Sequence, residues 1–143
     1  MATERTAHVV WRGDLMSGEG TIERVGSGAF GSLHVSWQAR AEEPGGKTSP
    51  EELIAAAHAS CFAMALSNGL GQAGTPPEEL DVSATVTFVP GTGITESALE
   101  VVATVPGIDE AAFEEAAQQA KAGCPVSQAL QGNVKIELTA TLR

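Results

Sequence analysis

Two cysteines and two charged residues are the side chains of this sequence that could together carry out redox chemistry: Cys61, Cys124, Arg40 and Glu51. The thiolate, not the thiol, is the reactive form of cysteine, and a free thiol with a pKa of about 8.5 is mostly protonated at neutral pH. A nearby guanidinium would stabilise the anion, and a carboxylate can hold that guanidinium in a bidentate pair. After a thiolate attacks a peroxide bond, a second thiol can capture the resulting sulfenic acid. These residue types are the minimal set for thiol-based peroxide reduction.

Each of these residues also has an interpretation that involves no chemistry. Buried free cysteines are common core residues. Glu51 would be favoured in the first turn of a helix by the helix dipole, and Arg40 could be an ordinary solvated charge. Cys124 lies between Gly123 and Pro125, at the expected start of a helix where amide dipoles favour an anion. Composition alone does not decide whether the four side chains meet.

His58 precedes Cys61 by three residues and would share its helix face. Such a pair raises the alternative of a metal site. The chain has only two cysteines and three histidines, however, and no C-x-x-C motif, so a structural zinc site has little support. We expect His58 to make a polar core contact, and we expect no metal and no cofactor.

The composition restricts the class of protein. The 143 residues, 43% of them hydrophobic, suit one domain over residues 1–143 with a sizeable core. A net charge of −10 argues against binding nucleic acid or anionic membranes. Residues 1–10 lack the apolar segment of a signal peptide, and the apolar stretch at 53–66 is shorter than the roughly 20 residues of a membrane span. Two cysteines are few for a secreted disulfide-rich domain, so we expect a soluble cytoplasmic protein.

Alternation of apolar residues and turn signals predict strands at residues 7–12, 20–25, 33–40, 81–89, 95–105 and 134–141. Ser49, Pro50 and Glu52 form a capping box that predicts a helix start. This helix should continue through Leu66 or slightly further, until a glycine-rich segment ends it. Further helices are expected at 110–122 and 124–130. The order of elements predicts an α+β fold with mostly antiparallel sheet.

The helix that begins after Ser49 is small and apolar on almost every side, so it should be buried on most sides. A chain this small has little with which to bury it, whereas a second copy would cover it. Glu51 and Cys61 are ten residues apart on this helix, about 15 Å along the axis and roughly 80° apart in direction. Two such helices packed antiparallel would bring Glu51 of one chain near Cys61 of the other. We therefore expect a homodimer with shared sites.

Two segments resemble the motifs of a known family. Residues 47–66, KTSPEELIAAAHASCFAMAL, closely resemble the first-cysteine motif of OsmC proteins, and residues 121–128, KAGCPVSQ, resemble their second-cysteine motif. Residues 38–40 and 105–109 also look like family features. The similarity spans essentially the whole chain, and both cysteine motifs are closer to the OsmC branch than to the Ohr branch. The implied structure is an OsmC-like fold, with mostly antiparallel sheets around a buried central helix in an intertwined homodimer.

The resemblance also assigns roles to residues by position. Cys61 matches the cysteine that attacks the peroxide, and Cys124 matches the resolving cysteine, so a Cys61–Cys124 disulfide is implied. Glu51 matches the glutamate after the motif proline, and Arg40 the arginine that activates the thiolate. The loop between Arg40 and Glu51 varies in the family. Arg12 and Arg24 are therefore the alternative candidates for the activating arginine.

The function implied by the resemblance is a thiol-dependent peroxidase, an antioxidant enzyme that reduces organic hydroperoxides and, less well, hydrogen peroxide. Its partners would be the hydroperoxide substrate, a dithiol reductant such as a lipoyl-bearing protein, and a second copy of the chain, without nucleic acid or membrane. One alternative keeps the same fold. In that case the apolar pocket would hold a lipid-like ligand in a stress protein, and the thiols would be incidental.

Overall fold

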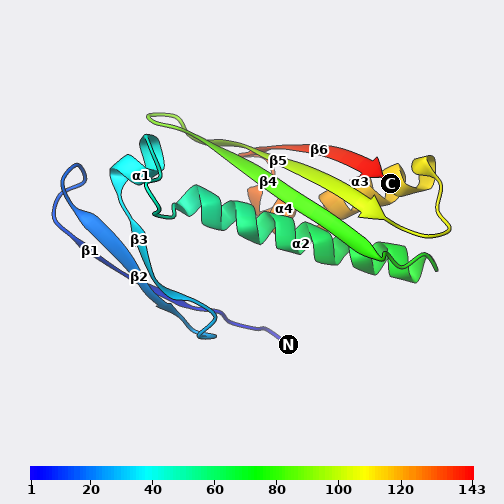
Figure 1. The fold of residues 1–143 in the computed structure, drawn as a ribbon, viewed down its shortest axis with the longest axis horizontal. Coiled ribbons are helices and arrows are strands. Elements are labelled where there is room, and N and C mark those ends of the chain that lie inside the picture. The colour runs from blue at the N-terminus through cyan, green and yellow to red at the C-terminus, as the bar shows by residue number, and fades with distance from the viewer. The chain divides into compact units, whose positions relative to one another are not determined.

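The computed structural model describes all 143 residues, which form two compact units, Met1–Leu53 and Ile54–Arg143. The order of elements along the chain is three strands, two helices, two strands, two helices and a strand (Figure 1). Their bounds are β1 Ala7–Arg12, β2 Glu19–Val25, β3 Gly31–Val35, α1 Trp37–Ala41, α2 Pro50–Gln72, β4 Glu79–Val89, β5 Gly93–Thr104, α3 Glu110–Gly123, α4 Pro125–Leu130 and β6 Lys135–Leu142. The expected α+β class is confirmed. The expectation of one domain over residues 1–143 stays a prediction.

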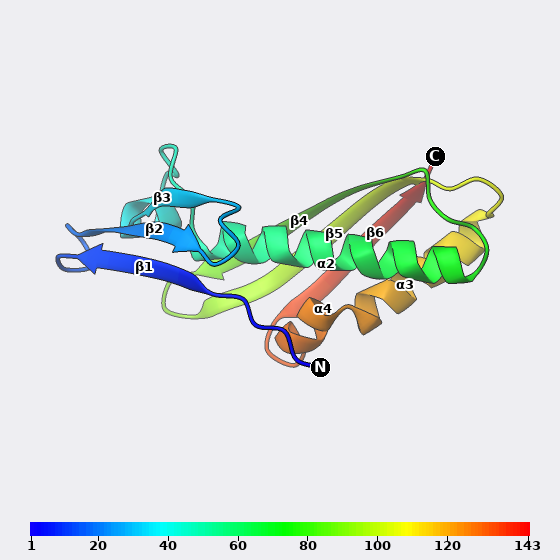
Figure 2. The ribbon, with the colours of Figure 1, turned by 90° about the horizontal axis from the view of Figure 1, so that it is seen from below.

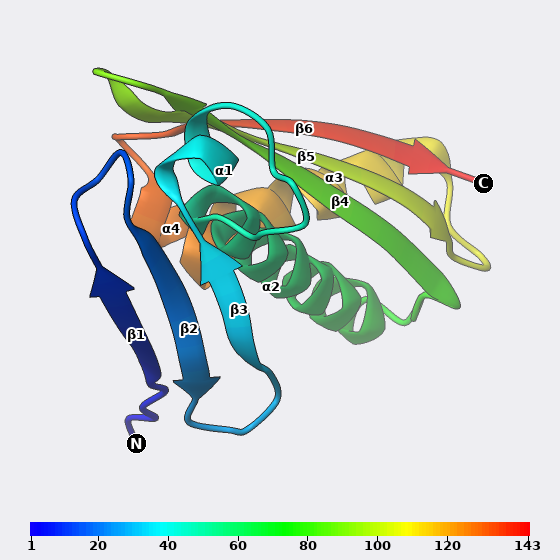
Figure 3. The ribbon, with the colours of Figure 1, turned by 60° about the vertical axis from the view of Figure 1, so that its left-hand side comes forward.

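The first unit contains an antiparallel sheet in the order β1–β2–β3, followed by α1 (Figure 3). The predicted strand over residues 33–40 is wrong beyond Val35, because residues Trp37–Ala41 are helical. Ser36 causes the change: its hydroxyl caps the helix and accepts a hydrogen bond from the Ala39 amide at 3.2 Å. The apolar alternation therefore continues by coincidence across a strand and a helix, and Arg40 lies in the last turn of α1.

The start of α2 follows the predicted capping box in part. The Ser49 hydroxyl accepts a hydrogen bond from the Glu52 amide at 3.1 Å, while the Glu52 carboxylate accepts one from the Thr48 hydroxyl at 2.9 Å. The helix continues beyond Leu66 and ends at Gln72. Glycines inside a helix cost only about 1 kcal/mol each, so Gly69 and Gly71 remain helical. Gly74, two residues after the helix ends, has a φ of +85° and turns the chain away.

The second unit contains a sheet in the order β4–β5–β6. Strands β4 and β5 form an antiparallel hairpin, and β6 pairs with β5 in parallel. Because a parallel partner cannot follow through a tight turn, α3 and α4 form the crossover connection. Figure 2 shows α2 and α3 along the same face of this sheet. The core between the sheet and the two helices contains buried apolar residues from α2, β5 and α3: Phe62, Leu66, Leu70, Leu99, Val101, Ala103, Phe113, Ala117 and Ala120.

Helix α2 buries only one stripe in the single chain, not most of its sides as its composition predicted. The buried side chains, His58, Phe62, Leu66 and Leu70, are four residues apart and so share one face. Other positions are exposed, and the Met64 side chain, at 72%, is the clearest case. By length and composition α2 could cross a membrane, with 22% of its most apolar window buried, although core helices of soluble proteins meet the same criterion. Apolar side chains therefore remain exposed on the other faces of α2.

Candidate active site

The two cysteines, far apart in sequence, lie in the same core in the second unit. Cys61 lies in the middle of α2 and is partly buried, while Cys124 is fully buried at the N-cap of α4. Both are free thiols, and each influences the ionisation of the other. The packing of α2 against the crossover connection therefore brings together the two thiols that the sequence singled out.

The two thiols compete for one negative charge. Burial raises the pKa of Cys61, and the hydrogen bond with Cys124 raises it further, against a smaller lowering by the Val126 amide. Burial also acts to raise the pKa of Cys124, but its contacts with Cys61, the Ser127 amide and hydroxyl, and the Val126 amide outweigh burial and lower it. Within this unit the charge is thus favoured on Cys124. An additional cation beside Cys61 would move the charge to that sulfur.

Arg40 and Glu51 form a bidentate ion pair in the first unit. Arg40 Nε donates to both carboxylate oxygens of Glu51, at 2.9 and 3.2 Å, and Nη2 donates to Oε1 at 2.7 Å. The Glu51 side chain is 8% exposed and the Arg40 side chain 31%. Such a fork fixes the plane of the guanidinium. The last turn of α1 and the first turn of α2 supply the two partners.

The paired arginine is the one predicted from the sequence. Arg12 and Arg24, the two replacements considered for Arg40, are exposed on β1 and β2. The charged pair belongs to one unit and the thiol pair to the other, and the continuous helix α2 carries one member of each, Glu51 and Cys61.

His58 lies in a buried polar network that the sequence predicted only as a core contact. Its Nδ1 is 2.6 Å from the Ser97 hydroxyl on β5, and its Nε2 is 2.8 Å from the Ser127 hydroxyl on α4. Burial lowers the pKa of His58, so the ring is neutral. Both serines are also buried, and sequence reasoning missed them. The sequence could have indicated Ser127, because it is the third residue of the helix that follows the N-cap Cys124, a position whose side chain approaches the N-cap residue.

These hydrogen bonds also bear on the metal alternative. Each ring nitrogen of His58 is within hydrogen-bond distance of a serine hydroxyl, and the chain contains no group of three or more His, Cys, Asp or Glu side chains that could hold a metal ion. The ring is therefore organised for hydrogen bonding within the core.

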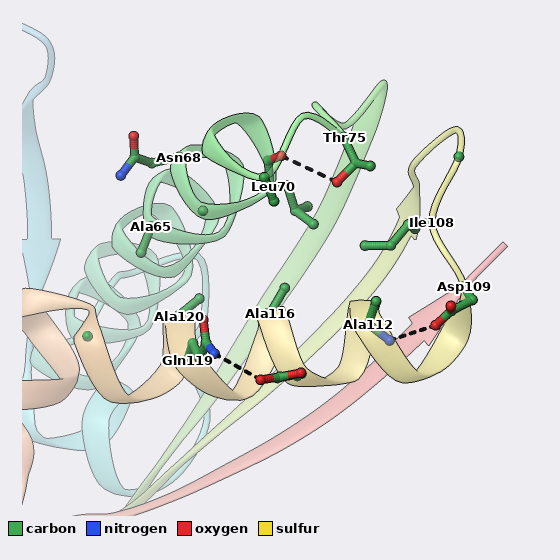
Figure 4. Close-up of a pocket in the computed structure, with 15 residues that line it drawn as sticks. Ala65, Asn68, Leu70, Thr75, Ile108, Asp109, Ala112, Ala116, Gln119 and Ala120 are labelled. Carbon is green, nitrogen blue, oxygen red and sulfur yellow. Dashed lines mark hydrogen bonds between the residues drawn. The ribbon is translucent and has the colours of Figure 1, made fainter.

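A groove of about 590 Å³ lies between the C-terminal half of α2 and helix α3 (Figure 4). Small and apolar side chains dominate its wall, among them Ala65, Leu70, Ile108, Ala112 and Ala116. Its size is within the usual range for small-molecule sites. Neither cysteine lines it.

Comparison with known proteins identifies the family. Residues 43–139 match the model of the OsmC-like protein family. The chain belongs to the OsmC-like family. It is 41% identical to peroxiredoxin OsmC of Escherichia coli (strain K12) over 140 residues, 96% of each protein. It is 32% identical to the organic hydroperoxide resistance protein of Xanthomonas axonopodis pv. citri (strain 306) over 96 residues, 66% of this chain and 68% of the relative.

Solved structures agree with this assignment. The crystal structure of an OsmC-like protein from Mycoplasma pneumoniae matches with a TM-score of 0.74 over 99% of both chains, at 19% identity. The expected OsmC-like fold is thereby confirmed. The names of the two sequence relatives support the expected enzyme class, a cysteine-based peroxidase. The more complete match to peroxiredoxin OsmC agrees with the closer resemblance of the cysteine motifs to the OsmC branch.

The neutral state of buried His58 predicts a dependence of stability on pH. The folded pKa is depressed, so below about pH 6.5 the unfolded chain binds a proton that the folded chain does not. The free energy of unfolding should therefore fall as the pH drops through this value, by up to about 1.4 kcal/mol per pH unit. The fall should end when the folded ring also protonates.

Urea denaturation between pH 7 and pH 5 would measure this effect in the unaltered chain and in His58→Gln, which keeps polar groups but cannot titrate. In the variant, the slope of the unfolding free energy against pH should be smaller, by up to about 1.4 kcal/mol per pH unit, because one titrating group is missing. His34→Gln, at an exposed position, controls for the replacement of a histidine as such. Equal slopes for His58→Gln and the unaltered chain would contradict the prediction.

Proposed function

We propose that this protein reduces organic hydroperoxides, and hydrogen peroxide less well, with Cys61 as the attacking thiolate and Cys124 as the resolving thiol. The observation that carries the proposal is that Cys61 on α2 and Cys124 at the N-cap of α4 lie in the same core as free thiols, where each shifts the pKa of the other. A thiol that must capture a short-lived sulfenic acid has to be next to it before the reaction begins. Neither a core cysteine nor a ligand-binding protein needs such a pair.

The proposed reaction has three steps. The Cys61 thiolate attacks one peroxide oxygen, the O–O bond breaks, and the alkoxide leaves as an alcohol after taking up a proton. Cys61 is then a sulfenic acid, and the Cys124 sulfur attacks it, so that an S–S bond forms and water leaves. An external dithiol, of the lipoyl type by family resemblance, reduces the disulfide through thiol–disulfide exchange and restores both thiols.

Arg40 is proposed to move the negative charge from Cys124 to Cys61. Burial and Cys124 both raise the pKa of Cys61, so an attacking thiolate at this position needs a cation. The guanidinium of Arg40 suits this role, because Glu51 fixes its plane while part of its surface stays exposed. A fixed guanidinium can also donate hydrogen bonds to peroxide oxygens without first losing conformational freedom.

A second copy of the chain is proposed to complete the site. Helix α2 leaves apolar and small side chains exposed on the face opposite its core stripe, including Ala56, Ser60 and Met64. Small side chains allow two helix backbones to approach closely. Since Glu51 and Cys61 are ten residues apart on one helix, about 15 Å along its axis, an antiparallel pair of α2 helices could join Glu51 of one copy with Cys61 of the other.

The working environment follows from the chemistry. Enzyme turnover requires both thiols to be returned to the reduced state, which a reducing compartment favours. We therefore propose that the protein acts in the cytoplasm and that α2 is a helix of a soluble dimer.

The groove between α2 and α3 supports a second candidate function, the binding of a lipid-like ligand. Its volume of about 590 Å³ and its apolar wall suit such a ligand. This candidate requires no contribution from the thiols, so the cysteine variants below separate the two functions.

The first prediction concerns the two thiols. Cys61→Ser should abolish turnover of cumene hydroperoxide with a dithiol, because serine has no accessible anion at neutral pH. Cys124→Ser should consume about one equivalent of peroxide per site and then stall or over-oxidise at Cys61. Peroxide consumption and mass spectrometry of the protein would measure both results. Reaction of Cys61→Ser together with failure of Cys124→Ser in the first turnover would reverse the roles.

The second prediction concerns Arg40. Arg40→Ala should raise the pKa of Cys61 and slow the peroxide step, by about tenfold for each unit by which the pKa rises above the working pH. Arg40→Lys should restore only part of the rate, because a point charge cannot make the forked contact. Arg24→Ala, at an exposed arginine, is the matched control. A thiolate titration of Cys61 that is the same in Arg40→Ala and the unaltered chain would remove Arg40 from the site.

The third prediction concerns sharing of the site between two copies. Cys61→Ser and Glu51→Ala subunits, each inactive alone, should regain activity when they are unfolded together and refolded. A heterodimer would then have one site that lacks both residues and one intact site, so a statistical mixture should recover roughly one quarter of the normal activity. Absence of recovery in heterodimers verified by mass spectrometry, or full activity of a folded monomer, would contradict shared sites.

A further inference from the structure

The buried network around His58 leads from β5 to the resolving cysteine. Ser97 on β5 meets Nδ1 of the ring at 2.6 Å, and Ser127 on α4 meets Nε2 at 2.8 Å. Ser127 is the third residue of α4 and Cys124 is its N-cap, so the two are three residues apart, about one turn, at the start of the helix. All four side chains are almost fully buried, between 0 and 3% exposed. The mechanism proposed above does not use His58 or either serine.

The tautomer of His58 decides which way the Ser127 hydroxyl points. A neutral imidazole donates from one nitrogen and accepts at the other. If Nδ1 carries the proton, it donates to Ser97, and Ser127 must donate to Nε2. If Nε2 carries the proton, it donates to Ser127 while the Ser97 hydroxyl donates to Nδ1. Only in this second state is the Ser127 hydroxyl proton available for the sulfur of Cys124.

We propose that His58 is a positioning residue for the resolving thiol: with Ser97 it holds the Nε2–H tautomer, so that the Ser127 hydroxyl donates its hydrogen bond to the Cys124 sulfur. The inference rests on the proposed function, because it assigns a role within the resolving step. It is consistent with the influence of the Ser127 hydroxyl on Cys124, whose pKa it lowers. A hydrogen bond to an ionised group is worth about 1.5–3 kcal/mol, or roughly 10- to 100-fold in the thiolate fraction.

The resolving step balances with this arrangement. Cys124 releases its proton and becomes a thiolate that accepts the hydrogen bond from Ser127. The thiolate attacks the sulfenic sulfur of Cys61, the S–S bond forms, and the S–O bond breaks. The departing hydroxide combines with a proton equivalent to the one that Cys124 released, and leaves as water. His58 stays neutral throughout, which its burial favours.

Around His58, hydrogen bonds and not nearby charges are available to set the tautomer of the ring. Helix α4 has no charged side chain, and the glutamates of β5, Glu96 and Glu100, alternate with Ser97 and so point to the other face of the sheet. On its own helix the nearest titratable group is Cys61, one turn away. Burial is the only cause that shifts the pKa of His58.

The thiolate of Cys124 can be titrated without any peroxidase activity. In a Cys61→Ser background, ultraviolet absorbance of the thiolate as a function of pH would give the pKa of Cys124. Ser127→Ala should raise it by about one unit or more, since the donor is removed. His58→Leu should also raise it, and His58→Gln should restore a lower value, because its amide N–H can take the place of Nε2–H. Ser83→Ala, at an exposed serine of β4, should leave it unchanged.

Two results of this titration would overturn the proposal. An unchanged pKa in Ser127→Ala would exclude the hydrogen bond. A raised pKa in Ser127→Ala, with equal values for His58→Leu, His58→Gln and the parent, would exclude His58 from any role in directing it. Circular dichroism identifies variants that do not fold. Nitrogen-15 shifts of the imidazole in the unaltered reduced protein then give an independent result, with Nε2–H supporting the proposal and Nδ1–H overturning it.

A kinetic measurement distinguishes failure of this inference from failure of the proposed function. With a chemical probe that traps sulfenic acids, Ser127→Ala should form the Cys61 sulfenic acid at least as fast as the unaltered protein but convert it to the disulfide about tenfold more slowly. A normal rate of disulfide formation in Ser127→Ala would overturn the inference. Failure of the unaltered protein to react with any hydroperoxide would overturn the proposed function instead, while the titration and the tautomer would still decide the role of His58.

Discussion

The packing of one stripe of α2 against the β4–β5–β6 sheet and α3 is the interaction on which the thiol site depends. His58, Phe62, Leu66 and Leu70 repeat every four residues and are completely buried. The same registry sets the position of Cys61, one residue before Phe62, at the edge of the buried stripe. Cys124 is buried in the same core at the start of α4. The thiols are therefore held together by apolar packing, without any covalent bond between them.

The polar groups of His58 in this core have hydrogen-bond partners, so burying the ring costs little free energy. An imidazole without partners in a dry interior would cost several kcal/mol, but here each ring nitrogen meets a serine hydroxyl. The ring links α2, which carries Cys61, to β5 and to α4, which begins after Cys124. A network with so few possible hydrogen-bond directions is well suited to orienting a neighbouring group, because a change at one member changes the direction of the next.

The Arg40–Glu51 ion pair belongs to the first unit, whereas both thiols belong to the second. The Arg40–Glu51 pair lies where α1 ends and α2 begins, with the carboxylate buried and the guanidinium partly exposed. The thiol pair by itself favours the charge on Cys124, since burial and Cys124 raise the pKa of Cys61. In the proposed mechanism, an activating cation on a different element would allow assembly of two copies to select the attacking sulfur, and the exposed side of α2 would provide the surface for it.

The sequence by itself determined the family, the α+β class, the helix that carries Cys61 and the four residues to examine, because cysteine motifs, caps and apolar periodicity are local properties of the chain. It also predicted the dipole-favoured position of Cys124 after Gly123. Only the tertiary structure decided that Ser36 ends a strand and begins α1, since a side-chain cap competed with a continuing alternation. Only the tertiary structure joined His58 to Ser97 and Ser127, because residues this far apart in sequence meet through the packing of α2, β5 and α4, which no local pattern encodes.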